Sequence, residues 1–157
     1  MCVTHKQTNY SDFAMTILFS KKCEYAMQAI LYLAAQKKGA LVSALEISRV
    51  IKIPREFISK ILQSLRKSGL IYSSKGKFGG FGLSKDPSRI RLIDVVSAID
   101  GLDMFDSCIL GFSTCSPSQP CPVHDRWGTL RNRTYDMLAT ETIDKLKDKT
   151  LTKIKSL

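Results

Sequence analysis

The chain has 157 residues, of which 44% are hydrophobic, so it can fold around one core rather than remain disordered. Its formal net charge is +10, and residues 42–91 hold 11 lysines and arginines against three carboxylates. Such a basic region favours a polyanionic partner such as nucleic acid, although the solvated face of an ordinary basic protein has the same composition. The longest apolar run, residues 29–35, is far shorter than the roughly 20 residues that span a bilayer, which argues against a membrane partner.

The N-terminal residues 1–14 are polar and show no periodicity, and they lack the basic-then-apolar layout of a signal peptide. We therefore expect a disordered arm, a domain that begins at residue 15 and a cytoplasmic location. In that reducing compartment, clustered cysteines are typical of metal or redox sites rather than of structural disulfides.

Three helices follow in the predicted domain. The first begins after Ser20 and runs to about residue 36, with apolar residues at the helical period. Ser43 and Glu46 form a capping box for a short second helix that ends near Val50. A third helix, residues 54–68, opens on a proline and ends before Gly69. The second and third helices predict a helix-turn-helix, although any pair of antiparallel helices would have this pattern.

Polar residues of the third helix are candidates for DNA contact, because the second helix of a helix-turn-helix enters the major groove. The side chains at its first turns are Arg55, Glu56, Ser59 and Lys60. Two short strands, 70–74 and 81–85, flank the glycine-rich segment KGKFGG and predict a wing, in which Lys75 and Lys77 would contact phosphates. The glycines match neither the Walker pattern nor a dinucleotide fingerprint, so a nucleotide-binding loop is disfavoured.

Residues 90–101 predict another amphipathic helix, and a long helix follows from about Pro122. This long helix carries a stripe of Trp127, Leu130, Thr134 and Leu138 at intervals of three or four residues. A second copy of the chain is the natural partner for such a stripe, and packing back on its own domain is the alternative. The segment 141–157 is rich in charge and predicts a frayed tail.

Three cysteines and a histidine lie between the last two helices, in the pattern Cys108-x6-Cys115-x5-Cys121-x2-His124. An iron–sulfur cluster ranks first as their ligand, because the glycine, serine and proline spacers let the loop wrap a bulky group. Zinc ranks second, since only the last pair has the spacing of a zinc knuckle. Free redox thiols rank third, and an enzyme such as a thiol oxidoreductase is disfavoured because no Cys-x-x-Cys pair occurs.

The order of these parts resembles bacterial winged-helix regulators that include IscR, NsrR and RirA, over roughly residues 15–140. The segments that carry the resemblance are SKKCEYAMQAILYLA, IPREFISKILQSL, SGLIYSSKGKFGGF, IRLIDVV and CPVHDRW. The resemblance implies a mainly α fold with a small β-wing: a winged helix-turn-helix domain plus a long C-terminal dimerisation helix. It also implies a homodimer without enzymatic activity that binds palindromic promoter DNA and carries a 2Fe–2S or 4Fe–4S cluster to sense iron, redox or nitric oxide status.

Carried over by position, Cys108, Cys115 and Cys121 match the three cysteine ligands of that family, and His124 has the spacing of the IscR histidine ligand. Glu24 stands where some relatives place a carboxylate that binds the cluster of the opposite subunit, although a solvated helix carboxylate is the simpler interpretation. The gap before Cys115 is one residue longer than in IscR, which leaves the cluster type open. The expected organisation is an arm at 1–14, a winged helix-turn-helix at 15–101, a cluster-binding loop at 102–121, a dimerisation helix at 122–140 and a tail at 141–157.

Overall fold

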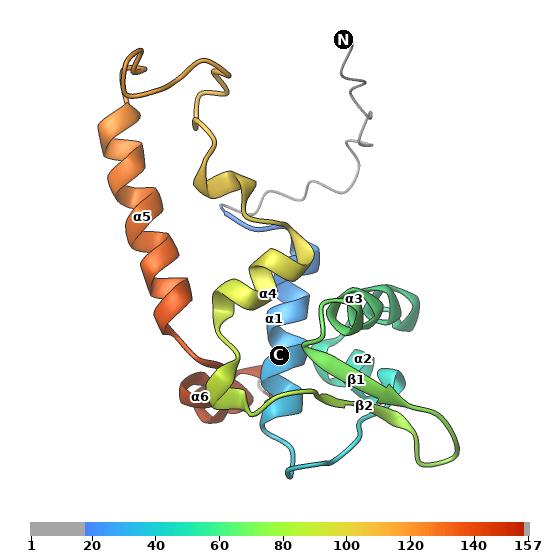
Figure 1. Ribbon diagram of the computed structural model, residues 1–157. Helices are drawn as coiled ribbons and strands as arrows, with labels where there is room; N and C mark the ends of the chain where they lie inside the picture. Colours follow the sequence, from blue (N-terminus) through green and yellow to red (C-terminus); the bar gives the residue numbers. More distant parts are fainter. Residues whose placement is uncertain (1–17, 156–157) are drawn as a thin grey trace.

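The computed structural model describes residues 18–155 of the chain (Figure 1). These residues form six α-helices and one two-stranded antiparallel sheet, in agreement with the predicted mainly α fold with a small β-wing. The predicted arm at 1–14 and the domain start at residue 15 lie outside the described residues. None of the helices in residues 18–155 combines the length and the hydropathy that a bilayer-spanning segment needs.

Helix α1 (Lys21–Ala34) is the central element, and α2, α3, α4, α6 and strand β2 all contact it. Its first turn is capped as predicted, because the Ser20 hydroxyl accepts a hydrogen bond from the amide of Cys23 at 3.1 Å. Ser20 also ties α1 to the end of α4, since its amide and hydroxyl donate to the Asp100 carboxylate at 2.8 and 2.6 Å. The N-terminus of α1 is therefore fixed beside the segment that leads to the cysteine loop.

Helices α2 (Ala44–Ile51) and α3 (Arg55–Lys67) form the helix-turn-helix. Lys52 joins them with a left-handed backbone, φ 58°. Pro54 is the N-cap of α3 rather than its first residue, and its carbonyl accepts from the amides of Phe57 and Ile58, both at 3.1 Å. At the start of α2 the Ser43 hydroxyl accepts from the Glu46 amide as predicted, while the Glu46 carboxylate accepts from the Tyr32 hydroxyl of α1 at 2.9 Å.

The predicted wing is confirmed as a hairpin of β1 (Ile71–Ser74) and β2 (Gly80–Leu83), with Ile71 opposite Leu83. Phe81 also exchanges two backbone hydrogen bonds with Val42, so β2 is held from its other side by the segment before α2. Glycine is required at position 80, because a Cβ there would lie 2.7 Å from the carbonyl oxygen of Val42. The tip turns through Gly76 at φ 108°, a conformation that residues with a side chain rarely adopt.

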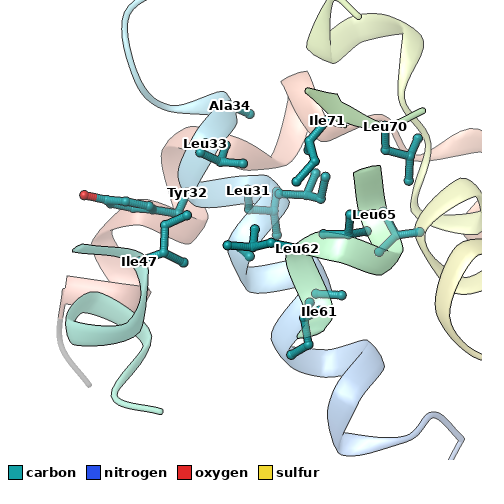
Figure 2. Packing of buried hydrophobic residues seen from close by; sticks show 14 of the residues in the cluster. Leu31, Tyr32, Leu33, Ala34, Ile47, Ile61, Leu62, Leu65, Leu70 and Ile71 are labelled. Atoms are coloured by element: carbon teal, nitrogen blue, oxygen red, sulfur yellow. The ribbon is translucent and has the colours of Figure 1, made fainter. Parts of the chain in front are cut away.

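The main hydrophobic core lies where α1, α3 and the wing meet, and Figure 2 shows Leu31, Leu62 and Ile71 among its converging side chains. The last helix, α6 (Ile143–Lys155), completes this core, since Ile143 is fully buried and Leu146 packs beside it. The prediction of a frayed tail is therefore wrong for residues 143–155. The apolar pair Ile143 and Leu146, three residues apart, packs against the core in a segment that is otherwise rich in charge.

Helix α4 (Leu92–Ile99) and the long helix α5 (His124–Thr140) are joined by the segment that carries the cysteines. In Figure 1, α5 stands apart from the body of the molecule at its N-terminal end and approaches it at its C-terminal end. There Leu138 joins a second buried cluster with Cys23, Ile93, Val96 and Phe105. The C-terminal end of α5 is therefore packed against the body of the molecule, whereas the cysteines lie next to its N-terminal end.

Candidate metal and nucleic-acid sites

The structure brings the three cysteines of the loop together. The Sγ atoms of Cys108, Cys115 and Cys121 all lie within 4.8 Å of one another, and Cys108 and Cys121 are 3.6 Å apart. His124 lies beside this group of three, with its Nδ1 3.1 Å from the Sγ of Cys115. All four residues are half-buried and line a cavity of about 230 Å³. The grouping predicted from the spacing is therefore present in the fold.

Three tight turns produce this convergence. The first is closed by the amide of Gly111 on the carbonyl of Cys108, with Gly111 at φ 76°. The second is closed by the amide of Cys115 on the carbonyl of Phe112. The third is closed by the amide of His124 on the carbonyl of Cys121, and it leads directly into α5. Each cysteine thus begins or ends a turn, which points its side chain to the inside of the loop.

The thiols of this group do not ionise equally. Desolvation raises the pKa of Cys108, but hydrogen bonds from the amides of Leu110 and Phe112 and from the neighbouring thiols outweigh it and bring the pKa below its usual range. The amide of Val123 lowers the pKa of Cys121, yet desolvation and the two other cysteines bring it above the usual range. Of these two thiols, that of Cys108 therefore loses its proton more readily than that of Cys121.

The predicted DNA-contacting residues lie on the opposite part of the molecule, on α3 and the wing (Figure 1). Arg55, Glu56 and Lys60 are exposed, whereas Ser59 is half-buried and its hydroxyl donates to the carbonyl of Arg55 at 2.8 Å. Lys75 and Lys77 are exposed at the hairpin tip. The structure therefore places these six residues on two adjacent protrusions.

The tip also presents an aromatic residue that the sequence analysis did not single out. Phe78 is 86% exposed, and the Nζ of Lys77 lies 5.8 Å from the centre of its ring. Such an exposed apolar ring is a candidate contact site, and its place directly after Lys75 and Lys77 at the tip is compatible with a groove of nucleic acid. Its position in a glycine-rich tip was the available signal.

The arrangement has known counterparts. A family model described as "Rrf2: Iron-dependent Transcriptional regulator" matches residues 19–149. The chain belongs to the Rrf2 family. An Aquifex aeolicus protein that bears the name of an HTH-type transcriptional regulator is 36% identical over 132 residues, which cover 83% of this chain and 91% of that protein. The HTH-type transcriptional regulator IscR of Escherichia coli O1:K1 is 31% identical over 127 residues, which cover 81% of this chain and 78% of IscR.

Solved structures agree on the Rrf2 fold. CymR of B. subtilis, described as the global cysteine regulator, superposes with a TM-score of 0.72 at 20% identity, covering 85% of this chain and 98% of CymR. T. potens IscR superposes with a TM-score of 0.64 at 24% identity, covering 87% of this chain and 89% of that one. The family match over residues 19–149 and the relatives at 31% and 36% identity make the protein a DNA-binding transcriptional regulator of the Rrf2 family and not an enzyme.

Glu24 is not part of the cysteine group of this Rrf2 chain. It lies on α1, where its carboxylate pairs with Lys21 at 2.7 Å, one turn earlier on the same helix. It does not line the cavity that the cysteines share. Its predicted role, binding the cluster of an opposite subunit, stays a prediction.

Two residues of the predicted dimerisation stripe, Trp127 and Leu138, make contacts within their own chain. Trp127 lines the cysteine cavity, and its indole nitrogen donates to the carbonyl of Ser107 at 2.9 Å. Leu138 is only 2% exposed and packs within its own chain, so it cannot supply a surface to a second copy. Leu130 is 58% exposed, and Thr134 is half-buried. The exposed apolar residue next along this face is Met137, at 52%.

The cavity has walls that the sequence analysis missed. Asp106 and Arg131 line it together with the cysteines, His124 and Trp127. Arg131 could have been found from spacing, because His124, Trp127 and Arg131 follow at intervals of three and four residues and so share one face of α5. Asp106 gave no such signal, since it precedes the loop in a segment without periodicity.

Proposed function

We propose that this Rrf2 regulator binds promoter DNA under the control of an iron–sulfur cluster held by Cys108, Cys115, Cys121 and His124. The observation that carries the proposal is the convergence of three thiols and one imidazole at the entrance to α5. The donor set fits such a cluster, because thiolates and imidazole are its usual protein ligands. The description of the matched family as iron-dependent supports the same conclusion. When bound, the cluster supplies a group that gains or loses electrons, or is lost altogether, in response to the cell's iron and redox state.

Zinc is the second candidate, and one distance is compatible with it. Two thiolates bound tetrahedrally at about 2.3 Å from one ion lie about 3.8 Å apart. The Sγ atoms of Cys108 and Cys121 are 3.6 Å apart, close to that value. The same spacing suits two thiolates on one tetrahedral iron of a cluster, so this distance allows both groups, and only thiolates on different irons would lie farther apart. In the zinc case the group would stabilise a nucleic-acid-binding protein that has no sensing role.

On the DNA side, α3 would enter the major groove with Arg55, Glu56, Ser59 and Lys60 near the base edges. Lys75 and Lys77 of the wing would contact the phosphate backbone. A palindromic site would be recognised by two copies of the chain, one for each half-site. The exposed positions of these charged side chains support this docking.

The two copies would meet along α5. Leu130, Thr134 and Met137 follow at four and three residues, so they form one face of the helix, and Trp127 lies one turn before them. Leu130 and Met137 are both more than half exposed. This exposure supports a second copy of the chain as the surface that covers them. Because His124 begins the same helix, the cluster and the dimer contact would share α5 as their support.

Anaerobic purification tests the ligand directly. A coloured protein with visible absorbance and matching iron and sulfide supports the cluster, whereas a colourless protein with one zinc per chain supports the alternative. Cys115→Ala should lose the bound group, and Ser113→Ala, a similar change at an exposed position of the same loop, should retain it.

Fluorescence anisotropy tests the control of DNA binding, with a site selected from random DNA by the wild-type protein. Loaded and apo protein should differ by roughly 5- to 150-fold in affinity at one salt concentration, the usual range of coupling between two sites. Identical affinities for loaded and apo protein would contradict gating and leave the cysteines a structural role.

A further inference from the structure

Arg131 of α5 contributes a positively charged side chain to the wall of the cysteine cavity. It is half-buried, it lines the cavity, and its Nη1 lies 3.5 Å from the carbonyl oxygen of Ser107. The indole of Trp127, one turn earlier on the same face, donates to that carbonyl at 2.9 Å. Ser107 immediately precedes Cys108. Two side chains of α5 therefore hold the backbone next to the first cysteine.

One donor of Arg131 lacks an acceptor. Its Nε is shielded from solvent and forms no hydrogen bond with any of residues 18–155. A buried N–H of a charged group is costly without an acceptor, so such a donor in a folded protein calls for an explanation. A thiolate or an inorganic sulfide in the cavity would be a suitable acceptor, because both carry negative charge.

The charge of the cavity points in the same direction. Among the described residues around it, Arg131 is the permanent cation, and Asp106 and the three cysteines supply negative charge. Three thiolates around a divalent ion leave a net charge of −1, and an electron added to a cluster makes the site more negative. A guanidinium at the wall lowers the energy of the more negative state.

We propose that Arg131 is a positioning and charge-compensating residue of this site: it donates from Nε to a sulfur of the bound group and stabilises its reduced form. This rests on the proposed function for the identity of the bound group. It assigns to Arg131 a part in setting the reduction potential, beyond the residues that bind the metal.

The test is an anaerobic redox titration of the loaded protein, followed by visible absorbance. Arg131→Gln should lower the reduction potential, and Arg131→Lys, which retains the charge without the Nε donor, should lie between it and the wild type. Arg133→Gln is the matched control, because it removes the same charge from an exposed position two residues away. Trp127→Phe removes the indole donor to the Ser107 carbonyl but keeps an aromatic side chain in the cavity wall, so it should shift the potential less than Arg131→Gln does.

Two results would overturn the proposal. One is a potential in Arg131→Gln equal to that of Arg133→Gln. The other is an equal shift in Trp127→Phe, which would reduce Arg131 to a clamp on the loop. Failure of the proposed function is seen separately, in a wild-type protein that holds no iron or sulfide. If that protein holds zinc, competition with a chelator replaces the titration: Arg131→Gln should bind zinc about 10- to 100-fold more weakly and Arg133→Gln as the wild type does, and equal affinities would refute the role.

Discussion

Leu130 and Leu138 lie about two turns apart on α5, one exposed and one buried, and allow both positions to be tested with one substitution, leucine to alanine. Leu138 is 2% exposed and contacts the small cluster that includes Ile93 and Phe105. Its truncation should cost about 3 kcal/mol in the free energy of unfolding, towards the lower end for buried leucines because few residues surround the cavity it leaves.

Truncation of Leu130 should instead weaken the dimer and leave the stability of each protomer almost unchanged. Burying a whole leucine side chain contributes about 1.5–3 kcal/mol. Because 58% of Leu130 is exposed, burial of this part by a partner could stabilise the dimer by up to roughly 1–1.7 kcal/mol per protomer. The two-fold axis places two copies of Leu130 in the interface and so doubles this free energy. Leu130→Ala should therefore weaken the dimer by up to roughly 30- to 300-fold, with little loss of stability in each protomer.

Sedimentation over a concentration series measures the dimer constant, and urea unfolding at one high protein concentration measures stability. Leu130→Ala should change the dimer constant, whereas Leu138→Ala should change the free energy of unfolding. A dimer constant unchanged by Leu130→Ala, or a free energy of unfolding unchanged by Leu138→Ala, would show that the role of that residue is assigned wrongly.

Arg55→Ala should cost about 1–3 kcal/mol against the preferred DNA site, whereas Lys77→Ala should weaken binding to all sequences alike and reduce the salt slope by about one; equal, sequence-independent losses in anisotropy titrations would contradict this division. Burial, followed by the nearby Asp100 carboxylate, raises the pKa of Cys23 to about 12, so its thiol stays protonated at pH 8. Mass spectrometry should then find Cys23 unmodified by iodoacetamide in the native protein, while Cys108 of the apo form reacts. Ile143→Ala should destabilise the fold by about 2–5 kcal/mol, because the residue is fully buried; a frayed tail would show no change in the urea midpoint.

The helix-turn-helix and wing were predictable because their signals are local. Ser20 and Ser43 cap their helices as their positions predicted, and Gly69 has the left-handed backbone expected after a helix, φ 73°. The cysteine group was also predictable, since its ligands lie within one loop and chemistry limits what three thiols and an imidazole do together. These features need only neighbours along the chain.

Features set by distant contacts were not predictable in this way. Ile143 packs in the core because the amide of residue 143 donates to the carbonyl of Ile90 at 2.9 Å, a pairing of segments more than 50 residues apart. The charges around it dominated the sequence pattern. Leu138 shares the helical period of the exposed stripe, yet it is buried in a cluster with Phe105, which comes from a segment far away in the sequence. Periodicity shows that a helix has an apolar face but not what covers each residue of that face.

The placement of the cysteines explains which motion a bound group can control. Cys121 and His124 border the first turn of α5, and the backbone beside Cys108 is held to α5 by Trp127, so a group bound by all of them fixes the loop against this helix. The C-terminal end of α5 is fixed by Leu138 against α4 and α1. We therefore propose that loss of the group would free the N-terminal half of α5 and leave the DNA-binding core intact. In the proposed dimer that meets along α5, this would change the angle between the two recognition helices rather than the structure of either, and DNA with two half-sites at fixed spacing would detect that angle.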